Sequence, residues 1–303
     1  TEPRPEFRFV LNIYEVLRPR GRFPCCVRQR SVHRKRVGRP VADVTTRVRR
    51  NRGHFPTLPA GTLPAMRIPV LMYHRIAPCP RGTLVPGHYV SPPQFQRHLY
   101  ALHRRGYETV TLQHMADGLR GSTPLPSKPI VLTFDDGYTN FIEAAVPVMC
   151  EFGMVGTVFV VSGQLGGTNS WDHNRGDTEE HLMTEEQIRL CADLGMEVGS
   201  HTVTHAHLTA VGLAEAESEI RASKEHIECV LSKEVTSFCY PYGEQNAAIQ
   251  ELVREAGYRS ACGTLRGLND AQTNPFLWRR INVRRTTSTP QLMWKIARAA
   301  RQP

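Results

Sequence analysis

Short apolar runs recur along the chain from residue 68 to residue 283, and stretches of more polar sequence separate them. The first run, Ile68 to Tyr73, contains six apolar residues or prolines in succession. Because strands this uniformly apolar are buried on both faces, the runs predict a parallel sheet covered by helices. The predicted strands span residues 68–73, 130–134, 155–161, 196–200, 235–240, 259–262 and 281–283.

Helical patterns fill the segments between these strands. Residues 93–105 place Phe95, Leu99 and Leu102 on one face of a helix. Thr184-Glu185-Glu186-Gln187 has the form of a capping box and opens a helix that runs to about Leu194. Further helices are predicted at 140–152, 211–231 and 247–256, with a last one that Thr289-Pro290 caps.

The alternation of strand and helix indicates the fold class. It repeats about seven times and predicts an α/β fold, a distorted (β/α)7-type barrel of parallel strands that is closed or nearly closed. Functional residues of such barrels lie at the C-terminal ends of the strands. We therefore expect the functional residues of this chain at those strand ends.

The segment before the first strand differs from the rest in charge and pattern. Residues 1–66 hold 15 Lys and Arg but 4 Asp and Glu, whereas the remainder holds 23 and 24. The net charge of +10 therefore belongs to this segment, which is rich in arginine and proline and lacks sustained periodicity. We expect a disordered basic segment over 1–66 and one folded domain over 67–303. Aromatic residues are too sparse in the segment to favour nucleic-acid binding.

Cysteine spacing and hydropathy exclude several further classes. The eight cysteines form no CxxC pair, and Cys25 and Cys26 are adjacent, so mostly buried free thiols are expected rather than a zinc ribbon or a disulfide framework. No apolar run is long enough to span a membrane. The stretch from Phe9 to Tyr14 is too short and too mixed for a secretory signal, so no signal peptide is visible.

Two carboxylates directly follow the predicted strand at 130–134. Asp136-Gly137 alone would be an ordinary turn. Asp135 and Asp136 together at the exit of a buried strand need a further reason, since an unpaired buried carboxylate is costly.

Two histidines follow the predicted strand at 196–200. His201 and His205 are four residues apart and can reach one cation. In a chain with 13 histidines the pair alone could be chance. Combined with Asp136, it supplies an open set of three ligands, which is typical of a catalytic rather than a structural metal site. Asp135 is then free to act as a base.

A third motif, Phe238-Cys239-Tyr240-Pro241-Tyr242-Gly243, ends the predicted strand at 235–240. By itself it would be a strand-terminating turn. In this order, however, TFDDGY, SHTVTH and YPYG resemble the polysaccharide deacetylase family, the NodB-homology domain or carbohydrate esterase family four. The segment from Pro69 to Ile76 resembles the branch of the poly-N-acetylglucosamine deacetylases, and the resemblance extends from about residue 68 to about residue 290.

The resemblance implies roles for individual residues. It implies a divalent metal held by Asp136, His201 and His205, zinc first, with cobalt, nickel, iron or manganese as alternatives. It implies Asp135 as general base and the backbone N–H of Tyr242 as an oxyanion donor. The implied reaction is removal of N-acetyl, or alternatively O-acetyl, groups from an amino-sugar polysaccharide or oligosaccharide by attack of a metal-bound water.

The chain departs from the family pattern at two points. The third motif usually begins with an arginine that pairs with the catalytic aspartate, but Cys239 stands there, so Arg280 becomes the candidate orienting charge. The usual C-terminal histidine is absent, since no histidine follows His226. In the poly-N-acetylglucosamine branch an N-terminal histidine fills that role, and by this resemblance His74 is the candidate acid.

Several alternatives remain open at the level of sequence. The same metal centre could serve an amidase on a non-carbohydrate substrate, or the chain could be an inactive carbohydrate-binding relic. Aromatic platforms would favour a sugar polymer, with Trp171 and Tyr242 as candidates and Trp278 as a third. The family resemblance points to the cell envelope or another extracytoplasmic site and to no nucleic acid. It leaves the polymer and the oligomeric state undetermined.

Overall fold

The seven predicted strands are all present in the computed structural model, which describes residues 66–301. All but β3 are a little shorter than predicted, β3 begins one residue earlier than predicted, and one further strand, β2, lies in sequence between the first and second of them. The strands are β1 (Val70–Tyr73), β2 (Glu108–Val110), β3 (Pro129–Phe134), β4 (Thr157–Val160), β5 (Glu197–Ser200), β6 (Ser237–Cys239), β7 (Ser260–Cys262) and β8 (Ile281–Asn282). Apart from Met66, the predicted segment 1–66 lies outside the described residues.

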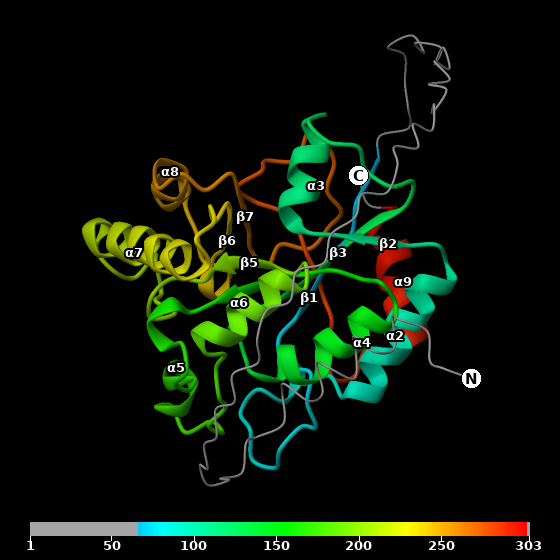
Figure 1. Ribbon diagram of the computed structural model, residues 1–303, viewed down its shortest axis with the longest axis horizontal. Helices are drawn as coiled ribbons and strands as arrows, with labels where there is room; N and C mark the ends of the chain where they lie inside the picture. The colour runs from blue at the N-terminus through cyan, green and yellow to red at the C-terminus, as the bar shows by residue number, and fades with distance from the viewer. Residues whose placement is uncertain (1–65, 302–303) are drawn as a thin grey trace, which may run out of the picture.

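One parallel sheet contains all these strands, in the order β7-β6-β5-β4-β3-β1-β8, with β2 beside the first half of β3. The sheet curls into a half-barrel (Figure 1). Within residues 66–301 no ladder joins β7 to β8, where a single bridge pairs Cys262 with Trp278. The barrel is therefore open between its two edge strands.

The predicted helices are confirmed in position, with two local differences. The segment predicted at 140–152 begins as a π-helical turn, Phe141–Ala145, and continues as an α-helix. The final helix is capped by Ser288, whose side chain forms a capping box with Gln291, so Thr289 and Pro290 lie in the first turn. The helices are α2 (Pro92–Arg104), α3 (Leu112–Leu119), α4 (Val146–Glu151), α5 (Ser170–His173), α6 (Glu185–Asp193), α7 (Leu213–Leu231), α8 (Ala247–Glu255) and α9 (Thr289–Ala299).

Three elements that the sequence did not predict are short. Strand β2 has three residues and α5 a single turn, so neither offers a period long enough to recognise. Helix α3 is two turns long and begins at the N-cap Thr111, whose side chain accepts a hydrogen bond from the His114 N–H. None of the helices between residues 66 and 301 is both long and apolar enough to cross a bilayer.

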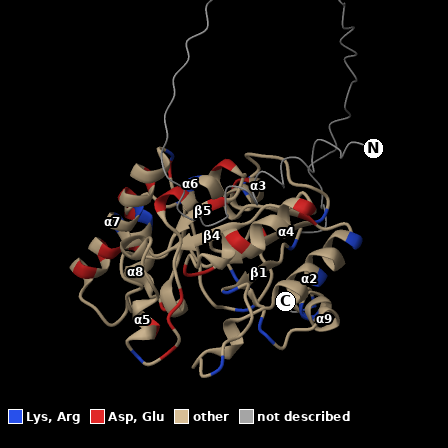
Figure 2. Cartoon of the chain, turned by 60° about the horizontal axis from the view of Figure 1, so that its bottom comes forward, with Lys and Arg blue, Asp and Glu red and all other residues tan. Residues whose placement is uncertain are grey.

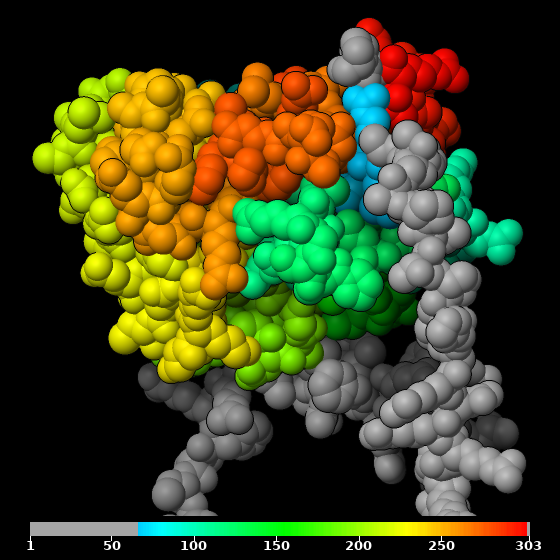
Figure 3. Space-filling view, turned by 90° about the horizontal axis from the view of Figure 1, so that it is seen from above, coloured from blue at the N-terminus to red at the C-terminus, as the bar shows by residue number. Residues whose placement is uncertain are grey.

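Side chains alternate between the two faces of the sheet, and the faces have different partners. Leu71 and Tyr73 belong to the large core between the sheet and the outer helices. Val70 and Val131 belong to a smaller core that includes Met115 of α3. Helix α3 thus fills the inner face near the start of the strands, beside the segment after β7 (Figure 3).

This alternation positions the functional residues. Asp135 is on the same face as Val131, and His74 is on the same face as Val70, since each pair is four residues apart. Both residues therefore emerge on the inner face, just beyond the part that α3 fills. The inner face of the sheet is therefore apolar near the start of the strands and carries polar side chains at their C-terminal ends.

Candidate active site

The C-terminal strand ends surround one cavity of about 230 Å³. Eight of the nine candidate residues of the sequence analysis line it: His74, Asp135, Asp136, Trp171, His201, His205, Tyr242 and Arg280. They come from the loops after β1, β3, β5 and β6, from helix α5, and from the segment before β8. Trp278, the third aromatic candidate, is 3% exposed and packs in the core under α3. Trp278 is therefore no part of a sugar platform.

Asp136, His201 and His205 form a compact group of potential ligands. The Oδ1 atom of Asp136 lies 3.4 Å from His201 Nε2 and 3.5 Å from His205 Nε2. One ligand atom from each residue lies within 4.8 Å of the other two, and all three side chains are buried. Burial alone would raise the pKa of Asp136, but hydrogen bonds with His201 and His205 hold it well below its usual value. The carboxylate is therefore ionised and able to bind a cation.

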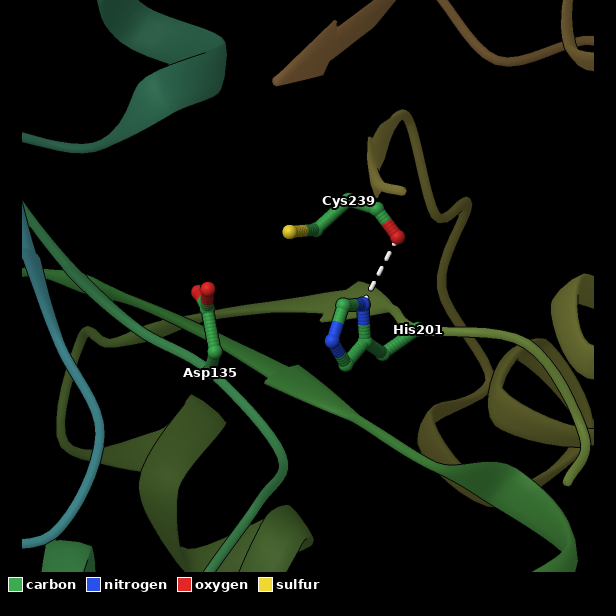
Figure 4. A group of neighbouring side chains, drawn as sticks. All are labelled: Asp135, His201 and Cys239. Carbon is green, nitrogen blue, oxygen red and sulfur yellow. Dashed lines mark hydrogen bonds between the residues drawn. The ribbon is translucent and has the colours of Figure 1, made fainter. Parts of the chain in front are cut away.

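A backbone carbonyl fixes the orientation of His201. Its Nδ1 atom lies 2.7 Å from the Cys239 carbonyl oxygen, which can only accept, so Nδ1 carries the proton (Figure 4). Burial alone would lower the pKa of His201, but its contacts with Cys239 and Asp136 raise it well above the usual value, so Nε2 also carries a proton that faces Asp136. A cation that displaced this proton would meet the Nε2 lone pair. A metal-binding histidine is commonly held in this way through its second nitrogen.

A second trio of potential ligands, Asp135, His201 and Cys239, shares this region (Figure 4). Here the Arg280 guanidinium already fills the space, with its NH2 nitrogen 3.3 Å from Cys239 Sγ and 2.8 Å from Asp135 Oδ2. A metal ion beside this cation would meet like charge. The trio is therefore better described as the binding site of the Arg280 side chain than as a metal site.

Arg280 forms a buried bidentate ion pair with Asp135. Two guanidinium nitrogens reach the carboxylate oxygens at 2.6 and 2.8 Å, and Nε donates to the Gly263 carbonyl at 2.7 Å. Both side chains are at most 5% exposed. Burial alone would raise the pKa of Asp135, but the charge of Arg280 lowers it below the usual value. Asp135 is thus ionised at neutral pH, and the arginine missing at position 239 is supplied from the segment before β8.

His74 lies beside the same carboxylate. Its Nε2 atom is 3.9 Å from Asp135 Oδ2, and its ring stacks on His88 with the centroids 4.0 Å apart. Burial, and next the charge of His88, lower the pKa of His74 to about 3. The ring is therefore neutral at pH 7. His88 also lines the cavity, although the sequence analysis did not single it out.

Aromatic rings form one wall of the cavity. Trp171 stacks on His205 at a centroid distance of 4.6 Å, and the Tyr242 ring meets His205 edge-on at the same distance. On its outer side Tyr242 stacks in parallel on His207, 3.8 Å away. The wall therefore supports a metal-ligand candidate and also presents flat apolar surface of the kind that sugar rings contact.

Backbone strain is concentrated around the cavity. Among residues 66–301, five non-glycine residues have a positive φ, and four of them belong to the site loops: Asp136 at 76°, Thr202 at 68°, His205 at 63° and Tyr242 at 59°. Each such conformation costs about 1–3 kcal/mol and persists where the surrounding structure imposes it.

A buried network behind the site was not predicted. Arg75 is fully buried, donates hydrogen bonds to the Tyr138 hydroxyl and to Asp172 Oδ2, the latter at 3.2 Å, and stacks over the Tyr138 ring. Asp172 lines the cavity beside Trp171. No local pattern marks these residues, because the contacts join segments 63 and 97 residues apart.

Comparison with known proteins identifies the relatives of this architecture. A polysaccharide deacetylase family model matches residues 122–261. The chain is 28% identical over 217 residues to the putative polysaccharide deacetylase YxkH of Bacillus subtilis, covering 72% of this chain and 71% of that protein. It is 26% identical over 188 residues to the poly-beta-1,6-N-acetyl-D-glucosamine N-deacetylase of Escherichia coli K12. That match covers 52% of this chain and 28% of the enzyme.

Solved structures share the fold. IcaB from Ammonifex degensii superposes with a TM-score of 0.64 at 25% identity, covering 76% of this chain and 97% of that chain. The family match also contains the two carboxylates and both histidines of the cavity, since residues 122–261 include positions 135, 136, 201 and 205. With this fold, this set of strand-end motifs and these relatives, residues 122–261 of the chain are identified as a polysaccharide deacetylase domain.

Proposed function

We propose that this protein is a metal-dependent deacetylase that hydrolyses N-acetyl groups on an amino-sugar polysaccharide. One observation carries the proposal: an open cluster of Asp136, His201 and His205 lies next to an ionised, buried Asp135 in one cavity. A hydrolase needs both parts, a site for an electrophilic cation and a base beside it. The family and its E. coli relative supply the class of substrate.

The three side chains fit a divalent cation. Their donor set, two imidazoles and one carboxylate, suits zinc and related transition metals. The Nδ1 proton of His201 is already engaged by a carbonyl, which leaves Nε2 for a ligand. A cation bound there would lower the pKa of a water and polarise the acetyl carbonyl.

Asp135 is proposed to remove the proton from the attacking water. Arg280 holds both oxygens of its carboxylate in a fixed plane, so the base is positioned before substrate arrives. Asp135 precedes a ligand candidate in sequence yet faces a different partner. That arrangement separates the base from the cation site.

The oxyanion is proposed to be stabilised by the backbone N–H of Tyr242. In the described part of the chain this N–H makes no backbone hydrogen bond, whereas Gly243 and Glu244 donate to Tyr240 and Pro241. The left-handed conformation of Tyr242 belongs to this turn. A fixed donor of this kind costs no reorganisation during the reaction.

His74 is proposed to protonate the departing amine. Because its ring is neutral at rest, it must first receive a proton, and Asp135 holds the one taken from water. The two side chains are 3.9 Å apart, a distance that a small ring movement closes. The proton thus moves from water to Asp135, to His74 and finally to the sugar nitrogen.

The direct test is an assay for both products of hydrolysis. Zinc-loaded protein is incubated with oligomers of poly-β-1,6-N-acetylglucosamine and with acetylated chitooligosaccharides, and acetate and free amine are quantified. Both should appear in equal amounts, and Asp135→Asn should reduce the rate by ~10²–10⁴-fold while retaining the metal. Release of acid from small acylated peptides but from neither glycan would replace the proposal with a general amidase.

A further inference from the structure

A second cavity, of about 310 Å³, adjoins the active site. The two cavities share three wall residues, Thr264, Arg280 and Asn282. The second lies where the sheet is open, between the segment after β7 and the edge strand β8. A chain of sugars that places one residue over Asp136 would therefore place a neighbouring residue along this opening.

Three cations line the second cavity in addition to Arg280. They come from different elements: Arg266 from the loop after β7, Arg284 from the turn after β8, and Lys295 from α9. The two arginines are exposed and Lys295 is half-buried. In the described part of the chain, no carboxylate forms an ion pair with any of the three.

Lys295 is held in place within this group. Its ammonium donates to the Asn282 carbonyl at 2.8 Å and to the Thr287 hydroxyl at 3.1 Å. Burial, and next the charges of Arg266 and Arg284, lower its pKa. The charged groups that act on Lys295 are therefore of its own sign, and the cluster lacks a neutralising partner.

The charges of the described residues are distributed in the same sense. Lys and Arg occur around α2 and α9, whereas many Asp and Glu lie on α6 and α7 (Figure 2). The catalytic cavity itself contains Asp135, Asp136 and Asp172. An acidic reaction centre therefore opens into a basic groove along the free edge of the sheet.

We propose that this groove is a subsite for a sugar that carries an anionic group, a carboxylate or a phosphate, next to the acetylated amino sugar. The inference rests on the proposed deacetylase function and refines its substrate class. Guanidinium groups suit both anions because their N–H groups match pairs of oxygen atoms. A glucosammonium residue, the product of deacetylation, would be repelled from the same place.

The test compares substrates that share one backbone. Initial rates are measured for N-acetylated chitotetraose and for its C6-carboxylated and C6-phosphorylated forms. With two exposed arginines and one lysine at the groove, KM should be ~3- to 30-fold lower for an anionic form than for the neutral one. The preference should shrink as sodium chloride is raised, since the arginines are exposed. The anionic form with the lower KM identifies whether the groove prefers a carboxylate or a phosphate.

Two double variants distinguish the groove from net charge. R266Q/R284Q should abolish the preference for the anionic tetramers. R189Q/R221Q removes the same charge from α6 and α7, where each arginine pairs with a glutamate on its own helix, and should keep the preference. Equal KM values in the unaltered protein, or a preference that survives R266Q/R284Q, would overturn the proposal.

A binding measurement separates this proposal from the deacetylase function. Cellotetraose and its C6-carboxylated form contain no acetyl group, so the unaltered protein cannot turn them over. Calorimetry should show tighter binding of the carboxylated form, weakened in R266Q/R284Q. If no glycan is deacetylated but this selectivity is observed, the proposed function is wrong and the proposed subsite for an anionic sugar is still supported. Absence of charge-selective binding contradicts the groove alone.

Discussion

At the scale of single residues, the neighbours Asp135 and Asp136 have separate partners. Asp136 faces two imidazoles, whereas Asp135 is paired with the guanidinium of Arg280. Both carboxylates are buried, so each depends on its partner for the energy of its charged form. The proposed roles of the two acids, base for Asp135 and metal ligand for Asp136, therefore rest on which side chains each carboxylate contacts.

The Asp135–Arg280 pair should show strong coupling in stability. R280Q leaves a buried carboxylate without its cation and should lower the free energy of unfolding by about 3–5 kcal/mol. D135N/R280Q removes both charges and should be less destabilised than the sum of the single variants, by about 0.5–3 kcal/mol. Urea unfolding of the four proteins measures the cycle. Strict additivity would mean that the pair does not stabilise the charged base.

His74 should be needed for turnover but not for the fold. H74A should keep its metal and melting temperature and lose ~10²–10⁴-fold in kcat, the usual contribution of general acid–base catalysis. His226 is exposed on α7 and offers a matched control, because H226A removes the same side chain away from the cavity. Steady-state kinetics of both variants decide the point. Near-normal kcat in H74A would remove it from the reaction.

At the scale of elements, the conformation of the loop after β3 sets the position of Asp136. Gly137 has a φ of 76°, and a Cβ added there would lie 3.2 Å from the backbone Cα of Val160 in β4. That atom belongs to the sheet and cannot move aside. The conformation of the loop, and with it the position of Asp136, therefore requires glycine at 137.

Replacing Gly137 with alanine should destabilise the protein more than the same change at an open site. Gly121 has a similar φ of 79° with no atom within 4 Å of an added Cβ, so G121A incurs the conformational cost alone, about 1 kcal/mol. G137A should cost at least 1–3 kcal/mol more, as overpacking does, and should weaken metal binding. Thermal unfolding and metal titration test this. Equal losses in both variants would mean that the loop tolerates a side chain.

The sequence was informative where patterns are local. Uniform apolar runs predicted seven strands, and residues directly after them proved to share one cavity because parallel strands end at the same side. The buried Arg75–Tyr138–Asp172 network had no such signal, since sheet order and not spacing brings it together. Cys239 at the usual arginine position showed that a charge was missing, and Arg280 was found as a candidate from its place near the last strand. Its bidentate geometry required the structure.

At the scale of the whole molecule, the domain boundary near residue 66 remains a prediction from charge and pattern. Ile68 is fully buried and its backbone exchanges hydrogen bonds with Asn269, so the described chain is anchored to the fold close to its first residue. A chain that begins at Met66 should stay soluble, keep its melting temperature and retain full activity. Gel filtration, thermal unfolding and the deacetylase assay check this. Aggregation or loss of activity would place part of the basic segment in the catalytic unit.

Hydrolysis of glycan acetyl groups is proposed to depend on a cation held by Asp136, His201 and His205. The most direct measurement follows acetate release from poly-β-1,6-N-acetylglucosamine oligomers together with bound metal per chain, for the unaltered protein and for H205A. We expect one metal per chain, loss of acetate release on chelation, recovery on adding zinc, and neither metal nor activity in H205A. Acetate release that withstands chelation, or H205A with a full complement of metal, would contradict this proposal.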